Sequence, residues 1–172
     1  VASAMADFTF MEEKANLFVS APNAIASNDT DTSGAKFQSE EAGNVCMTGT
    51  EEEILSAIHT LVSVLPANNE DDLSYDECTD DLNRLCEGLE GFAGDAAAAL
   101  SMISDDGFYL ELKKEYASSM VTAFIRLNGI TVGCVANRSE SLENGEKTAD
   151  YGTELTAQGC EKAAEFVNFC DA

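Results

Sequence analysis

Histidine and basic side chains are scarce in this chain, and their scarcity excludes several kinds of site. The 172 residues include one histidine, His59, so the sequence offers no Ser-His-Asp constellation and few ligands for zinc. Nine Lys and Arg stand against 32 Asp and Glu, which gives a formal net charge of −23. A chain of this charge repels nucleic-acid phosphates and anionic membranes, so we expect neither nucleic acid nor a membrane as a partner.

Long apolar runs and a basic leader are also missing. No stretch of the sequence approaches the ~18 consecutive apolar residues that a membrane-spanning helix needs. The N-terminal VASAMADFTFM carries no basic residue, so it does not have the pattern of a signal peptide. A hydrophobic content of 45% nevertheless indicates a globular chain, and 172 residues suffice for one domain with a core.

The six cysteines lack the spacing of a metal or redox motif, since no two of them form a Cys-x-x-Cys pair. Free cysteines behave as small apolar side chains and stay reduced in the cytoplasm. We therefore expect a cytoplasmic protein whose cysteines are unpaired and buried. They are Cys46, Cys78, Cys86, Cys134, Cys160 and Cys170.

Residues 120–137 carry the strongest local signal in the sequence. The segments 120–127 (MVTAFIRL) and 130–137 (ITVGCVAN) have the composition of strands, and Asn128-Gly129 joins them. Asn and Gly tolerate positive φ at the two central positions of a tight turn, so the sequence predicts a β-hairpin. Because a hairpin is combined with amphipathic helices, the expected fold class is α/β.

Two amphipathic helices are predicted, near residues 51–65 and 156–170. Thr50 and Glu53 form a capping-box pattern at the start of the first helix, and Pro66 ends it. Thr156 can cap the second helix. Apolar or small residues recur at helical spacing in both segments. They are Ile54, Leu55, Ile58, Leu61, Val62 and Leu65 in the first, and Ala157, Cys160, Ala163, Ala164, Val167 and Cys170 in the second.

The remaining segments are predicted as short elements and loops, from their composition and their turn residues. The predictions are strands within residues 6–11 and 108–112, a short helix over residues 96–103, polar loops over residues 28–49 and 67–94, and a mobile loop over residues 139–155.

Residues 29–40 match the spacing of a calcium-binding loop. The sequence DTDTSGAKFQSE places Asp29, Asp31, Ser33 and Glu40 at ligand positions of an EF-hand loop, with a glycine at position six. Lys36 stands where that motif favours an apolar residue, and the sequence has no second loop to pair with this one. A calcium-binding module at Asp29–Glu40 is one alternative function, and a polar loop that binds no metal is the prediction we prefer.

Two segments resemble a known family. FIRLNGITVGCVANRSE (residues 124–140) and GCEKAAEFVNFCDA (residues 159–172) resemble the carboxyltransferase subunit of biotin-dependent acyl-CoA carboxylases (beta type) and decarboxylases (alpha type). The resemblance implies a partial crotonase-like fold of ββα-type units, with its hairpin at Asn128-Gly129, and it implies that the chain is an internal fragment. Residues 1–105 would end the N-terminal crotonase-like half, and residues 106–172 would begin the C-terminal half.

The same resemblance implies the chemistry. Such subunits move a carboxyl group between carboxybiotin and an acyl-CoA, and backbone N–H groups of glycine-rich loops stabilise the enolate. Those loops would lie outside this chain, so we expect no catalytic residue and no metal site within it, and no activity from the segment alone. The residues implied to lie nearest the substrate form a biotin-facing "candidate wall" of Gly133, Ala136 and Asn137. The alternative is that these small residues only pack against a neighbouring strand.

The resemblance also implies a cofactor and partners. Biotin would be carried on a partner domain, with no cofactor bound directly by this chain. The partners would be an acyl-CoA, the biotin carboxyl carrier protein and other subunits of a carboxylase or decarboxylase complex, with a homo-oligomer as the assembly. An acidic, non-catalytic interaction module is a further alternative, because the charge alone fits a solvated surface.

Overall fold

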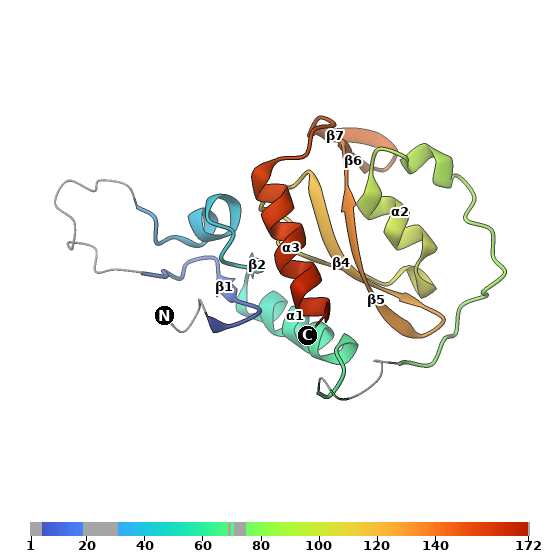
Figure 1. Cartoon of the computed structure of the whole chain (residues 1–172), viewed down its shortest axis with the longest axis horizontal. Coiled ribbons are helices and arrows are strands. Elements are labelled where there is room, and N and C mark those ends of the chain that lie inside the picture. Colours follow the sequence, from blue (N-terminus) through green and yellow to red (C-terminus); the bar gives the residue numbers. More distant parts are fainter. Residues whose placement is uncertain (1–4, 19–30, 69, 71–74, 172) are drawn as a thin grey trace.

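The chain combines helices with short strands, so the predicted α/β class is confirmed (Figure 1). The computed structural model describes residues 5–18, 31–68, 70 and 75–171. Within these residues the helices are α1 (Glu51–Val64), α2 (Ala96–Ile103) and α3 (Ala157–Asp171). The strands are β1 (Phe10–Glu12), β2 (Met47–Gly49), β3 (Tyr109–Leu112), β4 (Met120–Leu127), β5 (Ile130–Asn137), β6 (Glu140–Glu143) and β7 (Glu146–Asp150). Short helical turns cover Phe37–Glu41, Leu89–Phe92 and Asp105–Gly107.

The central sheet is antiparallel, in the order β3-β4-β5. β4 and β5 form the predicted hairpin, in which Leu127 pairs with Ile130. Asn128 and Gly129 have φ angles of +54° and +78°. A two-residue turn of this kind needs positive φ at both positions, which is why Asn-Gly occurs there. The hairpin prediction is confirmed.

Both faces of β4 are buried, because β4 lies in the middle of the sheet. Alternate residues of a strand point to opposite faces. Phe124 contacts Phe166 of α3 on one face, and the side chains on the other face are buried as well. A strand covered on both sides is apolar at nearly every position, as MVTAFIRL is. The buried residues of the second face are Val121, Ala123 and Ile125.

α1 begins at the predicted capping box. The backbone N–H of Thr50 donates to the carboxylate of Glu53 at 2.8 Å, and the N–H of Glu53 donates to the hydroxyl of Thr50 at 3.4 Å. Two of the amides that a helix start leaves unpaired are thereby satisfied. The helix ends at Val64, just before Pro66, as the sequence predicts.

The main core joins α1, the central sheet and α3. Residues before position 105 and residues after it contribute to the same cluster, so one core spans the two parts of the chain. Phe8 extends it by packing edge-on against Phe169, with ring centroids 4.5 Å apart. The buried members of the cluster are Leu61, Val64, Leu112, Phe124 and Phe166.

The prediction of a mobile loop over residues 139–155 is wrong, because this segment forms a second hairpin. β6 pairs with β7 in an antiparallel ladder, and Asn144 and Gly145 make the turn with φ angles of +52° and +81°. The turn chemistry is the same as at Asn128-Gly129, but the strands beside it are polar. The backbone N–H of Leu142 donates to the carboxylate of Asp95 at 2.8 Å, which fixes the hairpin to the start of α2.

The prediction of a plain loop over residues 28–49 is wrong at its C-terminal end. Met47–Gly49 forms β2, which pairs in parallel with β1 and places Met47 opposite Phe10. Parallel strands are joined by long connections, so their pairing depends on residues far apart in the sequence. Local composition therefore did not reveal β2.

All six cysteines are unpaired, as predicted, but they are not all buried. Cys46 is buried, whereas Cys160 and Cys170 are exposed. Both exposed cysteines lie on α3, and the Sγ of Cys170 lies beside Gly133 of β5 although the residue is exposed. The prediction of burial is wrong for these two residues, because helical spacing alone does not fix how wide the covered side of a helix is.

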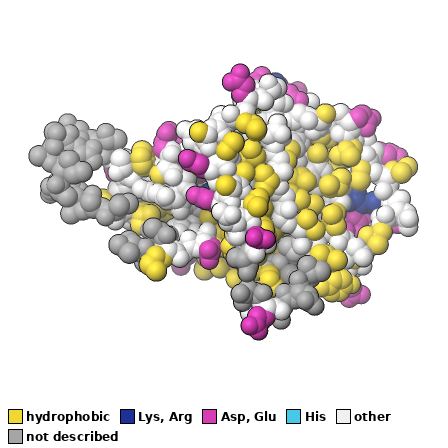
Figure 2. Space-filling model, viewed as in Figure 1, with side chains coloured by type: hydrophobic (Ala, Val, Ile, Leu, Met, Phe, Trp, Pro, Cys, Tyr) yellow, Lys and Arg dark blue, Asp and Glu magenta, His cyan; other side chains and the backbone are white. Residues whose placement is uncertain are grey.

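Acidic side chains are scattered over the visible face of the molecule rather than gathered in one cluster (Figure 2). This distribution fits the interpretation of the negative charge as a solvated surface. Among the helices of the described residues, none is both long enough and apolar enough to cross a membrane.

Candidate functional site

The three residues of the candidate wall lie on β5, but β5 does not bring them all to one face. Gly133 pairs with Phe124, Ala136 with Val121 and Asn137 with Met120. Because side chains alternate along a strand, Gly133 and Asn137 share the face that Phe124 presents to α3, and Ala136 lies on the opposite face. Four residues of strand separate Gly133 from Asn137 by roughly 13 Å.

Gly133 lies where α3 packs against β5. A Cβ at this position would be 2.7 Å from the Sγ of Cys170 and 3.3 Å from the ring of Phe166. Only glycine leaves the space that these two side chains occupy. Gly133 therefore packs against a helix, whereas the packing alternative named a neighbouring strand, and its role in the candidate wall stays a prediction.

Asn137 is exposed, and its side-chain amide has no hydrogen-bond partner among the described residues. An amide offers one acceptor oxygen and two N–H donors. Of the three residues of the candidate wall, Asn137 is thus the one with polar groups free to contact a ligand. Ala136 is half-buried and presents only a methyl group.

Arg138 fixes the backbone next to Asn137. Its side chain is buried, its Nε donates to the carbonyl oxygen of Ser118 at 2.5 Å, and its Nη2 lies 3.4 Å from Oε1 of Glu111. A buried ion pair is costly to break, since the remaining charge is left without a partner. The end of β5, and with it Asn137, is therefore linked to the turn that precedes β4.

Glu111 also organises the side chains around Arg138. The hydroxyl of Tyr109 donates to Glu111 at 3.0 Å, and the guanidinium of Arg138 stacks over the ring of Tyr151 with Cζ 5.1 Å from the centroid. Burial and the neighbouring Glu111 charge raise the pKa of Tyr109 far above its ordinary value, so this hydroxyl stays protonated as a donor. The cluster is positioned to orient backbone, not to transfer protons.

Sequence reasoning missed Arg138 and Glu111. Arg138 directly follows the strand segment ITVGCVAN, where a charged residue is the normal sign of an exposed strand end. Glu111 lies at an alternating position of a strand, where a polar residue predicts exposure. No local signal in the sequence pairs the two residues.

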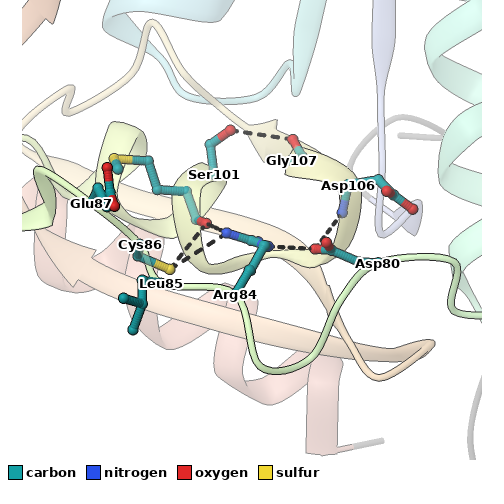
Figure 3. Close-up of a pocket in the computed structure, with 9 residues that line it drawn as sticks. Asp80, Arg84, Leu85, Cys86, Glu87, Ser101, Asp106 and Gly107 are labelled. Atoms are coloured by element: carbon teal, nitrogen blue, oxygen red, sulfur yellow. Dashed lines mark hydrogen bonds and ion pairs between the residues drawn. The ribbon is translucent and has the colours of Figure 1, made fainter.

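A second region with several charged groups is an open hollow of about 560 Å³ beside the C-terminal end of α2 (Figure 3). Arg84 lies at its centre and donates from Nε to Asp80 at 2.7 Å. Its two Nη atoms donate to the carbonyl oxygens of Met102 and Ser104 at 2.8 and 2.7 Å. The last carbonyls of a helix have no partner within the helix, and Arg84 supplies one here.

The contacts of Arg84 assign this hollow a structural role. Every nitrogen of the guanidinium already donates within the chain, and the carboxylate of Asp80 also accepts the N–H of Asp106 at 3.0 Å. The hydrogen bond from Arg84 holds the pKa of Asp80 below its ordinary value. Asp80 and Arg84 are four residues apart, which favours an ion pair on a helix, but residues 80–84 form no helix, so the spacing alone would not have revealed this pair.

The calcium hypothesis concerns a loop of which the structure describes only part. Asp29 lies outside the described residues. Within the part that is described, Asp31 accepts hydrogen bonds from the N–H and hydroxyl of Ser33, and Glu40 pairs with Lys36 at 3.8 Å. No group of three metal-binding side chains occurs among the residues that the structure covers. The preference for a polar loop without metal stays a prediction.

The chain is similar to known carboxyltransferases over nearly its whole length. It is 32% identical to the methylmalonyl-CoA carboxyltransferase 12S subunit of Propionibacterium freudenreichii subsp. shermanii, over 98% of this chain and 33% of that protein. It is 30% identical to the propionyl-CoA carboxylase carboxyltransferase subunit of Haloferax mediterranei, over 98% of this chain and 34% of that one. The chain thus spans about a third of the length of these relatives.

The fold leads to the same group of proteins. A crystal structure of transcarboxylase 12S superposes with a TM-score of 0.78 at 33% sequence identity, covering 98% of this chain and 34% of the other. The crotonase-like fold class, present here in part, is thereby confirmed. Residues 2–172 match the carboxyl transferase domain as a family. Because this match covers all but the first residue, the chain belongs to the carboxyl transferase domain family.

Proposed function

We propose that this chain is part of a biotin-dependent enzyme that moves a carboxyl group between carboxybiotin and an acyl-CoA. The observation that carries the proposal is the family match over residues 2–172, together with the fold shared with transcarboxylase 12S. Since the chain spans about a third of its relatives, the activity is proposed for the whole protein. We assign the stabilisation of the enolate to backbone N–H groups outside this chain.

Within the chain, the proposed contribution is to one wall of the biotin side of the site. Carboxybiotin, when bound, would supply the carboxyl group. The free amide of Asn137 can donate to a carbonyl oxygen and accept from an N–H, which fits the ureido group of biotin. Gly133 brings α3 against β5, and the ion pair of Arg138 with Glu111 holds the strand end. These residues orient and exclude water, and none of them transfers a proton.

We further propose that residues 1–105 end one crotonase-like half and that residues 106–172 begin the next. The separate β1-β2 and β3-β4-β5 sheets support this division, and the shared core of α1, the central sheet and α3 joins the two parts. The proposed partners are an acyl-CoA, a biotin carboxyl carrier protein, other subunits of the complex and further copies in a homo-oligomer. The similar transcarboxylase 12S is a hexamer assembly that binds methylmalonyl-coenzyme A. Location in the cytoplasm belongs to the same proposal.

The activity is tested with the whole protein that contains this chain and with the 172-residue chain alone. We expect the whole protein to transfer carboxyl from a carboxylated biotin donor to propionyl-CoA or acetyl-CoA, and the chain alone to transfer none. Turnover by the purified chain, abolished by a substitution within it, would contradict the assignment of the chemistry to residues outside. If the whole protein transfers no carboxyl group, the proposed function is wrong.

Asn137→Ala tests the role of the candidate wall. In the whole protein we expect the KM for the biotin donor to rise by about tenfold, the effect of one lost hydrogen bond in a binding site, with the KM for the acyl-CoA unchanged. Asn168→Ala, on the exposed side of α3, is the matched control. If the enzyme is active and the KM for the biotin donor is unchanged, Asn137 does not contact the donor. The carboxyltransferase proposal would then still stand.

A further inference from the structure

Lys162 is a buried cation that the proposed reaction does not use. Its side chain lies on the inner side of α3 and is 1% exposed. Nζ donates to the carbonyl oxygens of Lys113, Tyr116 and Met120 at 2.7, 2.9 and 2.7 Å. These bonds use all three donors of an ammonium group. Carbonyl dipoles therefore balance its charge, and no carboxylate in the described part of the chain forms an ion pair with it.

Lys113 and Tyr116 belong to the turn between β3 and β4, and Met120 is the first residue of β4. The turn is strained. Lys113 and Ala117 have φ angles of +51° and +44°, in the left-handed region that residues with a Cβ rarely adopt. Strained backbone of this kind persists only where surrounding contacts hold it. The turn has two internal backbone hydrogen bonds, from Tyr116 to Lys113 and from Met120 to Ala117.

A second buried cation holds the same turn from another element. Arg138, at the end of β5, donates from its side chain to the carbonyl oxygen of Ser118 and from its backbone N–H to that of Ser119 at 2.8 Å. Carbonyls on both sides of the strained Ala117 thus point to cationic side chains. The turn is therefore supported by α3 and by β5, in addition to its own internal hydrogen bonds.

We propose that the carbonyl oxygens of Lys113, Tyr116 and Met120 form a binding site for a primary ammonium group, which Lys162 fills from α3 to hold the strained turn 113–119 in place. Three acceptors within hydrogen-bond distance of one atom select a compact cation with three N–H donors over a quaternary one. The consequence is that α3 and the start of β4 move as one unit. This inference does not depend on carboxyl transfer.

The charge state of Lys162 is consistent with this site. Burial lowers its pKa to about 8, with Glu111 favouring the charged form and Arg138 and Lys113 opposing it. The ammonium is therefore the main form at neutral pH. Lys113, whose own side chain pairs with Glu165 of α3, adds a second link between the turn and the helix.

Lys162→Ala tests the site, because a small compound added to the solution can replace the side-chain atoms that the substitution removes. The substitution removes three carbons and the ammonium, which n-propylammonium matches in length and charge. We expect n-propylammonium to raise the melting temperature of the variant, or to restore its folding where it does not fold unaided. Propyltrimethylammonium and 1-propanol, which cannot donate three hydrogen bonds, should do neither. Lys147→Ala is the control, because Lys147 pairs with the carboxylates of Glu140 and Asp150 at the surface.

Lys162→Met provides a second measurement that does not need an additive. Methionine keeps an unbranched apolar stem but removes the donors. We expect amide hydrogen exchange in residues 113–119 to accelerate by at least about tenfold, the change for one charge-assisted hydrogen bond. Exchange equal to that of wild type would overturn the proposal, even if Lys162→Ala failed to fold in every additive. Equal responses of Lys162→Ala to all three additives would overturn it as well.

Discussion

Three cationic side chains bind backbone carbonyls at two places in the described chain. Lys162 and Arg138 hold the turn before β4, and Arg84 holds the last carbonyls of α2. The sequence has nine basic residues in all, so these three are a large share of them. Several of the few basic side chains thus complete hydrogen bonds that the backbone leaves open, although the surface carries a large excess of negative charge.

The pair of Asp80 and Arg84 makes stability depend on pH at the acid end. The hydrogen bond from Arg84 lowers the pKa of Asp80 below 3.8 in the folded chain. A carboxyl group with a lowered pKa stabilises the fold above its unfolded pKa, and this contribution disappears as the pH falls through the folded pKa. We expect Asp80→Asn to lower the free energy of unfolding at neutral pH, and the difference from wild type to vanish in acid.

Urea denaturation of both chains at a series of pH values measures this difference. Asp81→Asn is the control, since Asp81 is exposed and takes part in no ion pair within the described residues. If the deficit of Asp80→Asn is the same at neutral pH and in acid, the charge of Asp80 does not contribute.

At this scale the sequence reveals little of what holds the candidate site. Lys162 precedes Phe166 by four residues, so helical spacing could have placed it on the buried side of α3. Its partners are carbonyl groups, however, and a sequence does not show which carbonyls a fold brings together. Asn137 was found through the family resemblance, whereas the Arg138–Glu111 pair that fixes it joins distant strands and left no local pattern.

Two hairpins with the same Asn-Gly turn differ in what surrounds the glycine. Gly129 and Gly145 both have φ near +80°, where alanine costs about 1–2 kcal/mol. A Cβ on Gly129 would lie 2.0 Å from the carbonyl oxygen of Asp76, whereas a Cβ on Gly145 would have no atom within 4 Å. We expect Gly145→Ala to lose about 1–2 kcal/mol of unfolding free energy, and Gly129→Ala to lose more.

Each variant serves as the control for the other, because the turn type is shared and only the surroundings differ. Chemical denaturation gives both losses. Equal losses would mean that the contact with Asp76 relaxes without cost, and that backbone conformation alone decides the effect.

Elements that depend on interactions within a few residues could be predicted from the sequence. Elements that depend on pairing with a distant segment could not. The Thr50–Glu53 capping box and the Asn128-Gly129 turn act within a few residues, and both were identified from the sequence. The Asn144-Gly145 hairpin was missed because its polar strands lack the apolar alternation that marked the first one. β2 pairs with a strand far away in the sequence, which local composition does not show.

At the scale of the whole molecule, charge works against folding. A net charge of −23 on one small chain produces repulsion that the compact state concentrates. Added salt screens this repulsion, since the Debye length falls from about 30 Å at 0.01 M to about 10 Å at 0.1 M ionic strength. We expect the melting temperature to rise over this range of sodium chloride.

Tetramethylammonium chloride should raise the melting temperature equally, because screening depends on ionic strength and not on the cation. A lower melting temperature at 0.1 M would mean that ion pairs such as Lys113–Glu165 and Arg126–Asp76 outweigh the general repulsion.

The two turns also differ in how the chain will age chemically. Asparagine before glycine loses ammonia when the following backbone nitrogen attacks its side chain, which leaves aspartate or isoaspartate. At Gly129 that nitrogen is buried and donates to Asp105 at 2.7 Å, so it is not free to attack. At Gly145 the backbone is exposed. Of these two asparagines, Asn144 is therefore expected to deamidate first. Each event adds one negative charge at the tip of the β6–β7 hairpin, so stored protein becomes more acidic there.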